Sequence, residues 1–298
     1  MAVDRQVRAR SWRRNWSSFS VRSSLDVHSD HQFTIDPSRA FAKEGYSVAL
    51  IGRRENELKT LEDDIKASGA EVASFAIPSY AHGDVAAAFA QIHSRYPSSK
   101  YAIRAALYNA VHAIWKPFLD VTPEDVQSVT QTNIEGSFAF AHHVIKAFKN
   151  NSIDEVTGKR GILIFTGATS SINGNATTSA FAAGKFALRA LSQSLAKEFG
   201  QENIHVVHSI INGSIVTPVT KAWRNDPEWE QNQNVRLNPE SIAAVREILT
   251  NFPSSGMLIS LSDIVPVSPT YTWRSKTGPR GLGNWIFALR TGSGENKV

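Results

Sequence analysis

Short apolar stretches alternate with amphipathic stretches along most of this chain, and this alternation restricts the possible fold more than any other feature. The apolar stretches that we predict to be strands are 47–51, 71–77, 102–109, 161–166 and 204–211. The stretches with helical periodicity are 55–67, 84–96, 123–148 and 178–199. Apolar strands that alternate with helices form a parallel sheet covered on both faces. We therefore predict an α/β fold with a doubly wound parallel sheet, in which ligands bind at the carboxyl ends of the strands.

Composition and charge exclude several classes of protein. The 298 residues carry a net charge of +5, but the excess lies at the ends, since residues 1–22 hold six arginines and one acidic residue. Residues 268–298 hold five basic residues and one acidic residue, so the segment between is slightly acidic. A nucleic-acid partner would need a basic patch on a folded face, and we expect none. No apolar run is long enough to span a bilayer, and we expect no membrane partner.

The chain has no cysteine, which excludes disulfides, thiolate zinc sites and cysteine nucleophiles, and we expect no metal site. We predict one domain over 38–250, preceded by a basic segment 1–37 that is disordered or comes from a non-native exon. An irregular segment, 251–298, follows it. We expect a cytoplasmic protein, with the mitochondrion as the alternative because the arginine-rich, acid-poor start suits a transit peptide.

Five short motifs occur in the order of the predicted elements. They are Tyr108-Asn109-Ala110 at a strand end, Asn133 inside the next helix, Thr166-Gly167-Ala168 at the following strand end, Phe181 with Lys185, and Asn212-Gly213 with Thr217. Their order and spacing resemble the short-chain dehydrogenase/reductase family over about 70% of the chain. The resemblance implies a Rossmann-like, single-domain fold and an oxidoreductase that transfers hydride between a nicotinamide cofactor and a substrate.

The start of the chain departs from the family pattern. The family opens with a strand and a glycine-rich turn, where the backbone approaches the cofactor pyrophosphate at a helix N-terminus. Residues 1–44 contain no glycine, and only 18–22 has a weak strand pattern. We therefore predict that the phosphate loop and the normal first strand, which lies in the middle of the family's sheet, are lacking.

The residues that carry the family's chemistry are also changed. The Tyr-x-x-x-Lys pair stands here as Phe181 and Lys185, one helical turn apart. The resemblance implies that Lys185 holds the nicotinamide ribose, although a solvated helix lysine is the alternative. Phenylalanine has no proton to donate, so we expect impaired catalysis unless a water or a neighbouring hydroxyl, from Thr178 or Ser179, supplies the proton.

Two further catalytic positions follow from the resemblance. The family's serine falls on Ala168. Thr169, Ser170 and Ser171 are the nearest hydroxyls, and we expect Ser171 or Ser170 to replace it; a serine pair after a strand is otherwise a turn signal. Asn133 corresponds to the asparagine that distorts the family's helix and whose carbonyl holds a water relayed to the lysine. A local cap is the alternative role for Asn133.

Cofactor choice is indicated by Arg53 and Arg54 after the second predicted strand. Arginines there suit the 2′-phosphate of NADP(H), whereas an acidic residue would select NAD, which stays the alternative. Pro78 stands where the family has an adenine-contacting aspartate. The resemblance also implies that five residues belong to the cofactor site: Asn109, Ala110, Lys185, Gly213 and Thr217.

The function that follows is an NADP(H)-dependent oxidoreductase, impaired in catalysis, that acts on a carbonyl or alcohol group of a small molecule. The alternative is a non-catalytic dinucleotide-fold binding or regulatory protein, or a truncated inactive isoform. By the same resemblance we expect a homo-oligomer, formed through the helices that hold Asn133 and Lys185.

Overall fold

The fold is centred on a parallel sheet of seven strands. The computed structural model describes residues 18–23, 32–216, 221, 225–232, 237 and 258–260, with side chains from Ser38 onward except those of 258–260. The strand order is β3-β2-β1-β4-β5-β6-β7. The strands are β1 (Ser18–Ser23), β2 (Ser47–Gly52), β3 (Val72–Ala76), β4 (Ala102–Tyr108), β5 (Gly161–Ala168), β6 (Ile204–Ile211) and β7 (Leu258–Ser260). This order confirms the predicted doubly wound α/β architecture.

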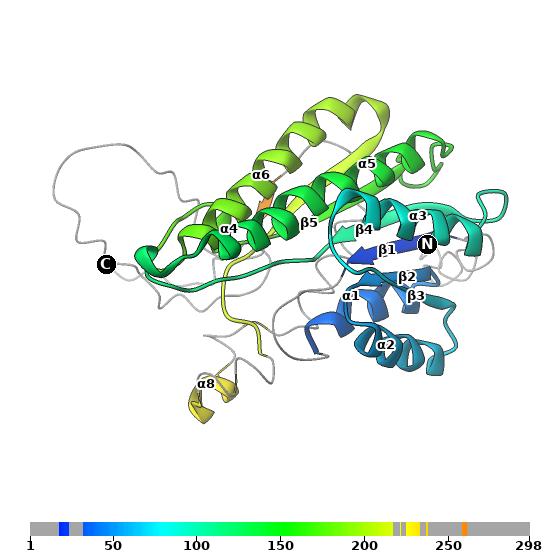
Figure 1. The fold of residues 1–298 in the computed structure, drawn as a ribbon. Coiled ribbons are helices and arrows are strands. Elements are labelled where there is room, and N and C mark those ends of the chain that lie inside the picture. Colours follow the sequence, from blue (N-terminus) through cyan, green and yellow to red (C-terminus); the bar gives the residue numbers. More distant parts are fainter. Residues whose placement is uncertain are drawn as a thin grey trace, which may run out of the picture.

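Helices cover both faces of the sheet, as Figure 1 shows. Helices α1 (Gln32–Lys43) and α2 (Glu55–Ala67) lie on one face. The other face carries α3 (His82–Arg95), α4 (Pro123–Val129), α5 (Gly136–Lys149) and α6 (Ser179–Phe199). A short helix, α8 (Pro227–Gln231), lies between β6 and β7 in the chain. No described helix is both long and apolar enough to cross a membrane.

The prediction that the chain lacks the normal first strand is wrong. β1 lies in the middle of the sheet and pairs in parallel with β2 on one side and β4 on the other. Strands pair through hydrogen bonds between backbone N–H and C=O groups. Residues 18–22 can therefore form a strand despite their weak apolar pattern, because β2 and β4 both have backbone groups available for pairing. Without β1, the facing edges of β2 and β4 would have unpaired backbone groups. β1 and the first residues of α1 thus belong to the described fold, although they fall inside the segment 1–37.

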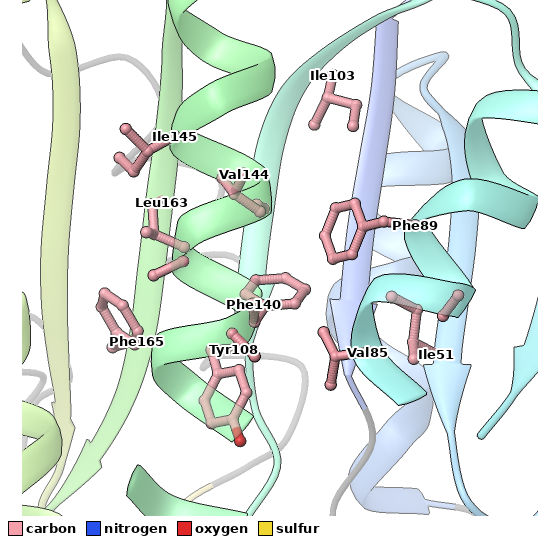
Figure 2. Close-up of a cluster of buried hydrophobic side chains, with 14 of the residues drawn as sticks. Ile51, Val85, Phe89, Ile103, Tyr108, Phe140, Val144, Ile145, Leu163 and Phe165 are labelled. Carbon is pink, nitrogen blue, oxygen red and sulfur yellow. The ribbon is translucent and has the colours of Figure 1, made fainter. Parts of the chain in front are cut away.

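The main hydrophobic core lies between the sheet and the helices α3, α5 and α6. Figure 2 shows Phe89 of α3, Phe140 and Val144 of α5, and Phe165 of β5 within this cluster. All four side chains are at most 2% exposed. This core fixes α5 and α6 against β4 and β5, which are the elements that carry the family motifs.

The segment predicted as one helix over 123–148 contains a change of helical pitch. Thr122 begins α4 with a capping box, since its hydroxyl accepts from the Asp125 amide at 3.2 Å and its own amide donates to the Asp125 carboxylate at 3.0 Å. Residues Thr130–Glu135 form a π-helical turn between α4 and α5. Such turns occur mostly as single bulges inside α-helices and are frequent at functional sites. This one contains Asn133.

Candidate functional site

The predicted site residues gather along one edge of the sheet. Because all strands are parallel, their carboxyl ends meet there. Arg53 and Arg54 follow β2, Asn109 and Ala110 follow β4, and Ala168 ends β5. The structure therefore brings together the positions that the resemblance assigns to a cofactor and to catalysis.

Lys185 reaches this edge from α6. Its Nζ donates to the carbonyl oxygen of Thr166 at 2.7 Å, and the residue is only 3% exposed. The hydroxyl of Thr166 in turn donates to Oδ1 of Asn109 at 2.7 Å. Hydrogen bonds thus connect α6, β5 and the end of β4. The burial of Lys185 does not match the alternative of a solvated helix lysine.

Asn133 joins the π-helical turn to the loop after β4. Its Oδ1 accepts from the backbone N–H of His112 at 2.8 Å, and its Nδ2 donates to the carbonyl of the same residue at 3.1 Å. Gly184 of α6 lies against this side chain, because a Cβ there would stand 2.6 Å from Nδ2 of Asn133. The side chain therefore makes a long-range clamp, not the local cap that was the alternative.

The distorted turn has a second anchor in β4. The hydroxyl of Tyr108 donates to the carbonyl oxygen of Thr132, and both side chains are buried. A π-helical turn breaks the regular i→i−4 ladder and leaves carbonyls that need other donors. The hydroxyl of Tyr108, at the end of β4, is one such donor.

Phe181 occupies the position of the family tyrosine and contacts an aromatic residue that sequence reasoning missed. The ring of Trp115, in the loop after β4, lies 5.3 Å from the Phe181 ring between centroids. Phe181 is 8% exposed and Trp115 is 60% exposed, so a buried phenyl ring contacts a largely exposed indole. Nζ of Lys185 lies 6.0 Å from the Phe181 centroid, within the range of a cation–π contact. An apolar surface therefore stands where the family has a phenolic hydroxyl.

The hydroxyl groups near the end of β5 have structural partners. Oγ of Ser171 accepts from the amide of Ala168 at 3.0 Å, and the Ser171 side chain is completely buried. Thr178 accepts from the amide of Asn175 and donates to its carbonyl. The more exposed hydroxyl of Thr169 donates to Oδ1 of Asn212 at 2.7 Å, across the ends of β5 and β6.

The two arginines after β2 have different partners. The guanidinium of Arg54 forms an ion pair with the carboxylate of Glu57, the closest N···O distance being 2.7 Å. The guanidinium carbon of Arg53 lies over the ring of Tyr80, 5.3 Å from its centroid. Both arginines are partly buried. Their positions at the carboxyl end of β2 agree with those expected for contacts to the adenosine half of a dinucleotide.

The end of β6 is the last part of this edge that can be compared with the prediction. Gly213 follows Asn212 and is exposed, and a Cβ on it would lie 3.1 Å from Cγ of Leu237. The glycine therefore lets the side chain of Leu237 approach the strand end. Thr217 lies outside the described residues.

Two histidines of β6 are buried next to the site. His208 packs against Gly167, where a Cβ would stand 2.2 Å from its Nε2, and neither ring nitrogen of His208 or His205 has a hydrogen-bond partner among the described residues. Burial, followed by the charges of Lys185 and Arg189, lowers the pKa of His208 to about 3. Burial, followed by the charge of Lys159, lowers that of His205 to about 4. Both imidazoles are neutral near pH 7.

Tyr80 and Trp115 are the contact residues that sequence reasoning missed. Both stand just beyond the carboxyl end of a strand, in the loops after β3 and β4 respectively. That position is the signal that could have singled them out, because side chains there face the ligand edge of a doubly wound sheet. Their pairing with Arg53 and Phe181 depends on residues far along the chain.

A nicotinamide dinucleotide fits the described part of this edge. The partly buried arginines after β2 suit the adenosine half, and buried Lys185 beside the end of β5 suits a ribose. Pro78 offers no side-chain acceptor for an adenine amine. The segment that would contact the pyrophosphate, 24–31, lies outside the described residues.

Comparisons with known proteins identify the family. A family model described as short chain dehydrogenase matches residues 35–228. Glucose 1-dehydrogenase of Gluconobacter oxydans is 27% identical over 191 residues, covering 63% of this chain and 67% of that enzyme.

Two solved structures are also similar to this chain. A short-chain type dehydrogenase/reductase from Mycobacterium marinum has a TM-score of 0.67 at 20% identity, covering 82% of this chain and 93% of that one. Actinorhodin polyketide ketoreductase, solved with NADPH, has a TM-score of 0.66 at 16% identity, covering 81% and 95%. At such identities, these structures show a likeness of fold alone.

Proposed function

The chain belongs to the short-chain dehydrogenase family and is an oxidoreductase of that family, and we propose that it uses NADP(H) to interconvert a carbonyl and an alcohol on a small molecule. The observation that carries the choice of cofactor is the pair of arginines after β2. Guanidinium groups bind phosphates bidentately, and the 2′-phosphate is the group that distinguishes NADP(H) from NAD(H).

The residues proposed to hold the cofactor lie along the carboxyl edge of the sheet. They are Arg53, Arg54, Asn109, Ala110, Lys185, Gly213 and Thr217. The cofactor, when bound, supplies or accepts the hydride. Support for the role of Lys185 is its burial and its hydrogen bond to Thr166, which direct the ammonium group to the end of β5.

The proton that accompanies hydride transfer has no phenolic donor at position 181. We expect slow turnover, in which the proton comes from water or from a hydroxyl near the end of β5. Among the serines first considered, Ser171 is buried and bound to the Ala168 amide, so a role for it in proton transfer would require that loop to open. The hydroxyl of Thr169 is more accessible than that of Ser171 and becomes our preferred candidate at the end of β5.

Asn133 has a supporting role in this proposal. Its side chain fixes the backbone of His112 in the loop after β4, and that loop also carries Trp115. Trp115 and Phe181 then form an apolar surface beside Lys185. We propose that the reacting part of the substrate lies against this surface.

Calorimetric titration of the full chain with NADPH and with NADH tests the cofactor assignment. We expect saturable binding of NADPH that is tighter than binding of NADH. Lys185→Met serves as a matched variant, because it keeps the chain length of the side chain and removes the charge, and we expect it to weaken both cofactors. Absence of binding at millimolar cofactor would refute the proposed enzyme function.

We also propose a homo-oligomer formed through the outer faces of α4, α5 and α6. Large apolar side chains are exposed on these helices and on the short segment before them, namely Phe118, Leu119, Val126, Phe138 and Phe186. Contiguous exposed apolar surface is typical of protein interfaces. Sedimentation velocity of the parent chain and of Phe138→Ser tests this: we expect an oligomer that the substitution weakens.

A further inference from the structure

Trp115 lies in the loop after β4 with most of its side chain exposed, although tryptophan is usually among the well-buried residues of a folded chain. The residue is 60% exposed, and its ring contacts that of Phe181 at 5.3 Å between centroids, with 46° between the ring planes. Burying a large aromatic side chain is favourable. An exposed indole at the ligand edge of the sheet is therefore a surface on which an apolar group of a ligand can bind.

The backbone on both sides of Trp115 is held by hydrogen bonds to other elements. Three residues before it, the amide and the carbonyl of His112 bind the side chain of Asn133, at 2.8 Å and 3.1 Å. One residue after it, the amide of Lys116 donates to the carbonyl oxygen of Thr177 at 2.9 Å. The indole is thus presented by an ordered backbone, so a ligand that binds it has little loop disorder to overcome.

Thr177, the acceptor of the second hydrogen bond, has an unusual backbone conformation. Its φ is +66°, a left-handed value that a β-branched residue rarely adopts. Such conformations cost free energy and occur mostly at functional sites, where the surrounding structure imposes them. Helix α6 begins two residues later, at Ser179, and carries Phe181 in its first turn. The strained residue therefore connects the loop after β4 with the start of α6, which brings Trp115 against Phe181.

The charged residue next to Trp115 is paired with another element. Nζ of Lys116 lies 2.6 Å from the carboxylate of Asp125, in the first turn of α4. The carboxylate neutralises this ammonium group and holds it towards α4. The surface of Trp115 and Phe181 is therefore suited to apolar contact, and we expect the group that binds it to be uncharged.

The aromatic pair also has a defined position relative to the proposed chemistry. Phe181 contacts Trp115 through its ring, and Nζ of Lys185 lies 6.0 Å from the centroid of the same ring. Lys185 in turn donates to the carbonyl oxygen of Thr166 near the end of β5. A substrate whose reacting carbon lies at the end of β5 can thus place the adjacent substituent against Phe181 and Trp115.

From these contacts we infer that the substrate carries a flat, uncharged aromatic group next to its carbonyl or alcohol carbon, and that Trp115 is the specificity-determining residue that binds this group. The inference rests on the proposed function, since it names the substrate class of the same site. Aromatic pairs in offset or edge-to-face arrangements are stabilised beyond the area that they bury. A saturated group of the same size gains only the apolar contact.

Equilibrium binding to the NADPH-loaded full chain, measured by ligand-observed NMR titration, tests the inference without requiring turnover. The probes are two neutral methyl ketones: acetophenone has an aromatic ring, and cyclohexyl methyl ketone has a saturated ring with the same number of carbons. We expect the parent to bind acetophenone more tightly. Trp115→Leu should weaken acetophenone by about 2- to 12-fold more than cyclohexyl methyl ketone.

Two variants serve as controls for this comparison. Trp115→Phe keeps an aromatic ring at the same position and should retain the preference for acetophenone. Phe118→Leu removes an exposed ring from the same loop and should also leave the preference unchanged. Thermal unfolding of Trp115→Leu should follow that of the parent, because the indole is largely exposed.

Other outcomes overturn the inference. Equal losses of both ketones in Trp115→Leu would mean that the indole supplies area alone, and unchanged binding of both would mean that it does not contact the substrate. If this variant dissociates an oligomer in sedimentation velocity and leaves ketone binding unchanged, the indole belongs to a subunit interface. A parent that binds NADPH without preferring acetophenone refutes the inference and leaves the proposed function standing. A parent that does not bind NADPH refutes both.

Discussion

The buried histidines of β6 are expected to make folding stability depend on pH between about 3 and 6.5. His205 and His208 are each 2% exposed, and their ring nitrogens have no hydrogen-bond partners in the part of the chain that the structure describes. Burial lowers their pKa values from 6.5 to about 4 and about 3, respectively. Below the pKa of the unfolded chain, the unfolded state therefore binds protons that the folded state excludes.

The sign and size of the effect follow from these values. Stability is fully present above about pH 6.5 and falls as the pH drops, because protonation then favours the unfolded chain. At about pH 4.5, each histidine costs about 2–3 kcal/mol, or about 5 kcal/mol for both. This is comparable with the whole margin of a domain, about 5–15 kcal/mol.

Urea unfolding of the full chain at about pH 7.5 and about pH 4.5 measures the effect. His208→Leu removes one of the two titrating groups and keeps an apolar side chain, so it should lose about 2–3 kcal/mol less than the parent between these two values. His93→Gln changes an exposed histidine and should follow the parent. Equal losses in the parent and in His208→Leu would refute the assignment of a depressed pKa to His208.

Three substitutions test other parts of the site. Phe181→Tyr restores a phenolic donor and should raise turnover with NADPH by about 10²- to 10⁴-fold in a steady-state assay if the cofactor binds; unchanged turnover would show that proton donation does not limit the rate. Gly184→Ala places a Cβ 2.6 Å from Nδ2 of Asn133, and denaturant unfolding should show a loss of about 1–3 kcal/mol; no loss would mean that α6 can move away. Tyr108→Phe removes the donor to the Thr132 carbonyl and should cost about 1–3 kcal/mol in the same assay, whereas a neutral result would indicate that water replaces the hydroxyl.

Most of the fold could be predicted from the sequence, because buried apolar residues recur with different periods in strands and in helices. The pattern over 204–211 predicted β6 with its bounds, and the pattern over 55–67 predicted α2 with its bounds. The first strand was missed, since its apolar pattern is weak and its place in the sheet depends on pairing with β2 and β4, which are distant in the sequence. Local periodicity indicates which residues are buried, but it does not indicate which strands pair with one another.

The sequence predicted which residues belong to the candidate site, but it did not predict which side chains contact one another. The spacing of Phe181 and Lys185 placed them one helical turn apart, but the contact of Phe181 with Trp115 joins α6 to the loop after β4. The two arginines after β2 looked equivalent in the sequence, yet one faces Glu57 and the other lies over Tyr80. Side-chain partners of this kind come from elements packed in three dimensions.

The sequence alone determined the alternation of strands and helices, the absence of a phenol at position 181 and the arginines at the end of β2. These properties follow from residue identity and from periodicities of a few residues. Tertiary structure decided that β1 completes the sheet, that Asn133 clamps the loop at His112, and that Tyr80 lies under Arg53. Each of these depends on free energies of burial and hydrogen bonding between segments far apart in the chain, which no local pattern contains.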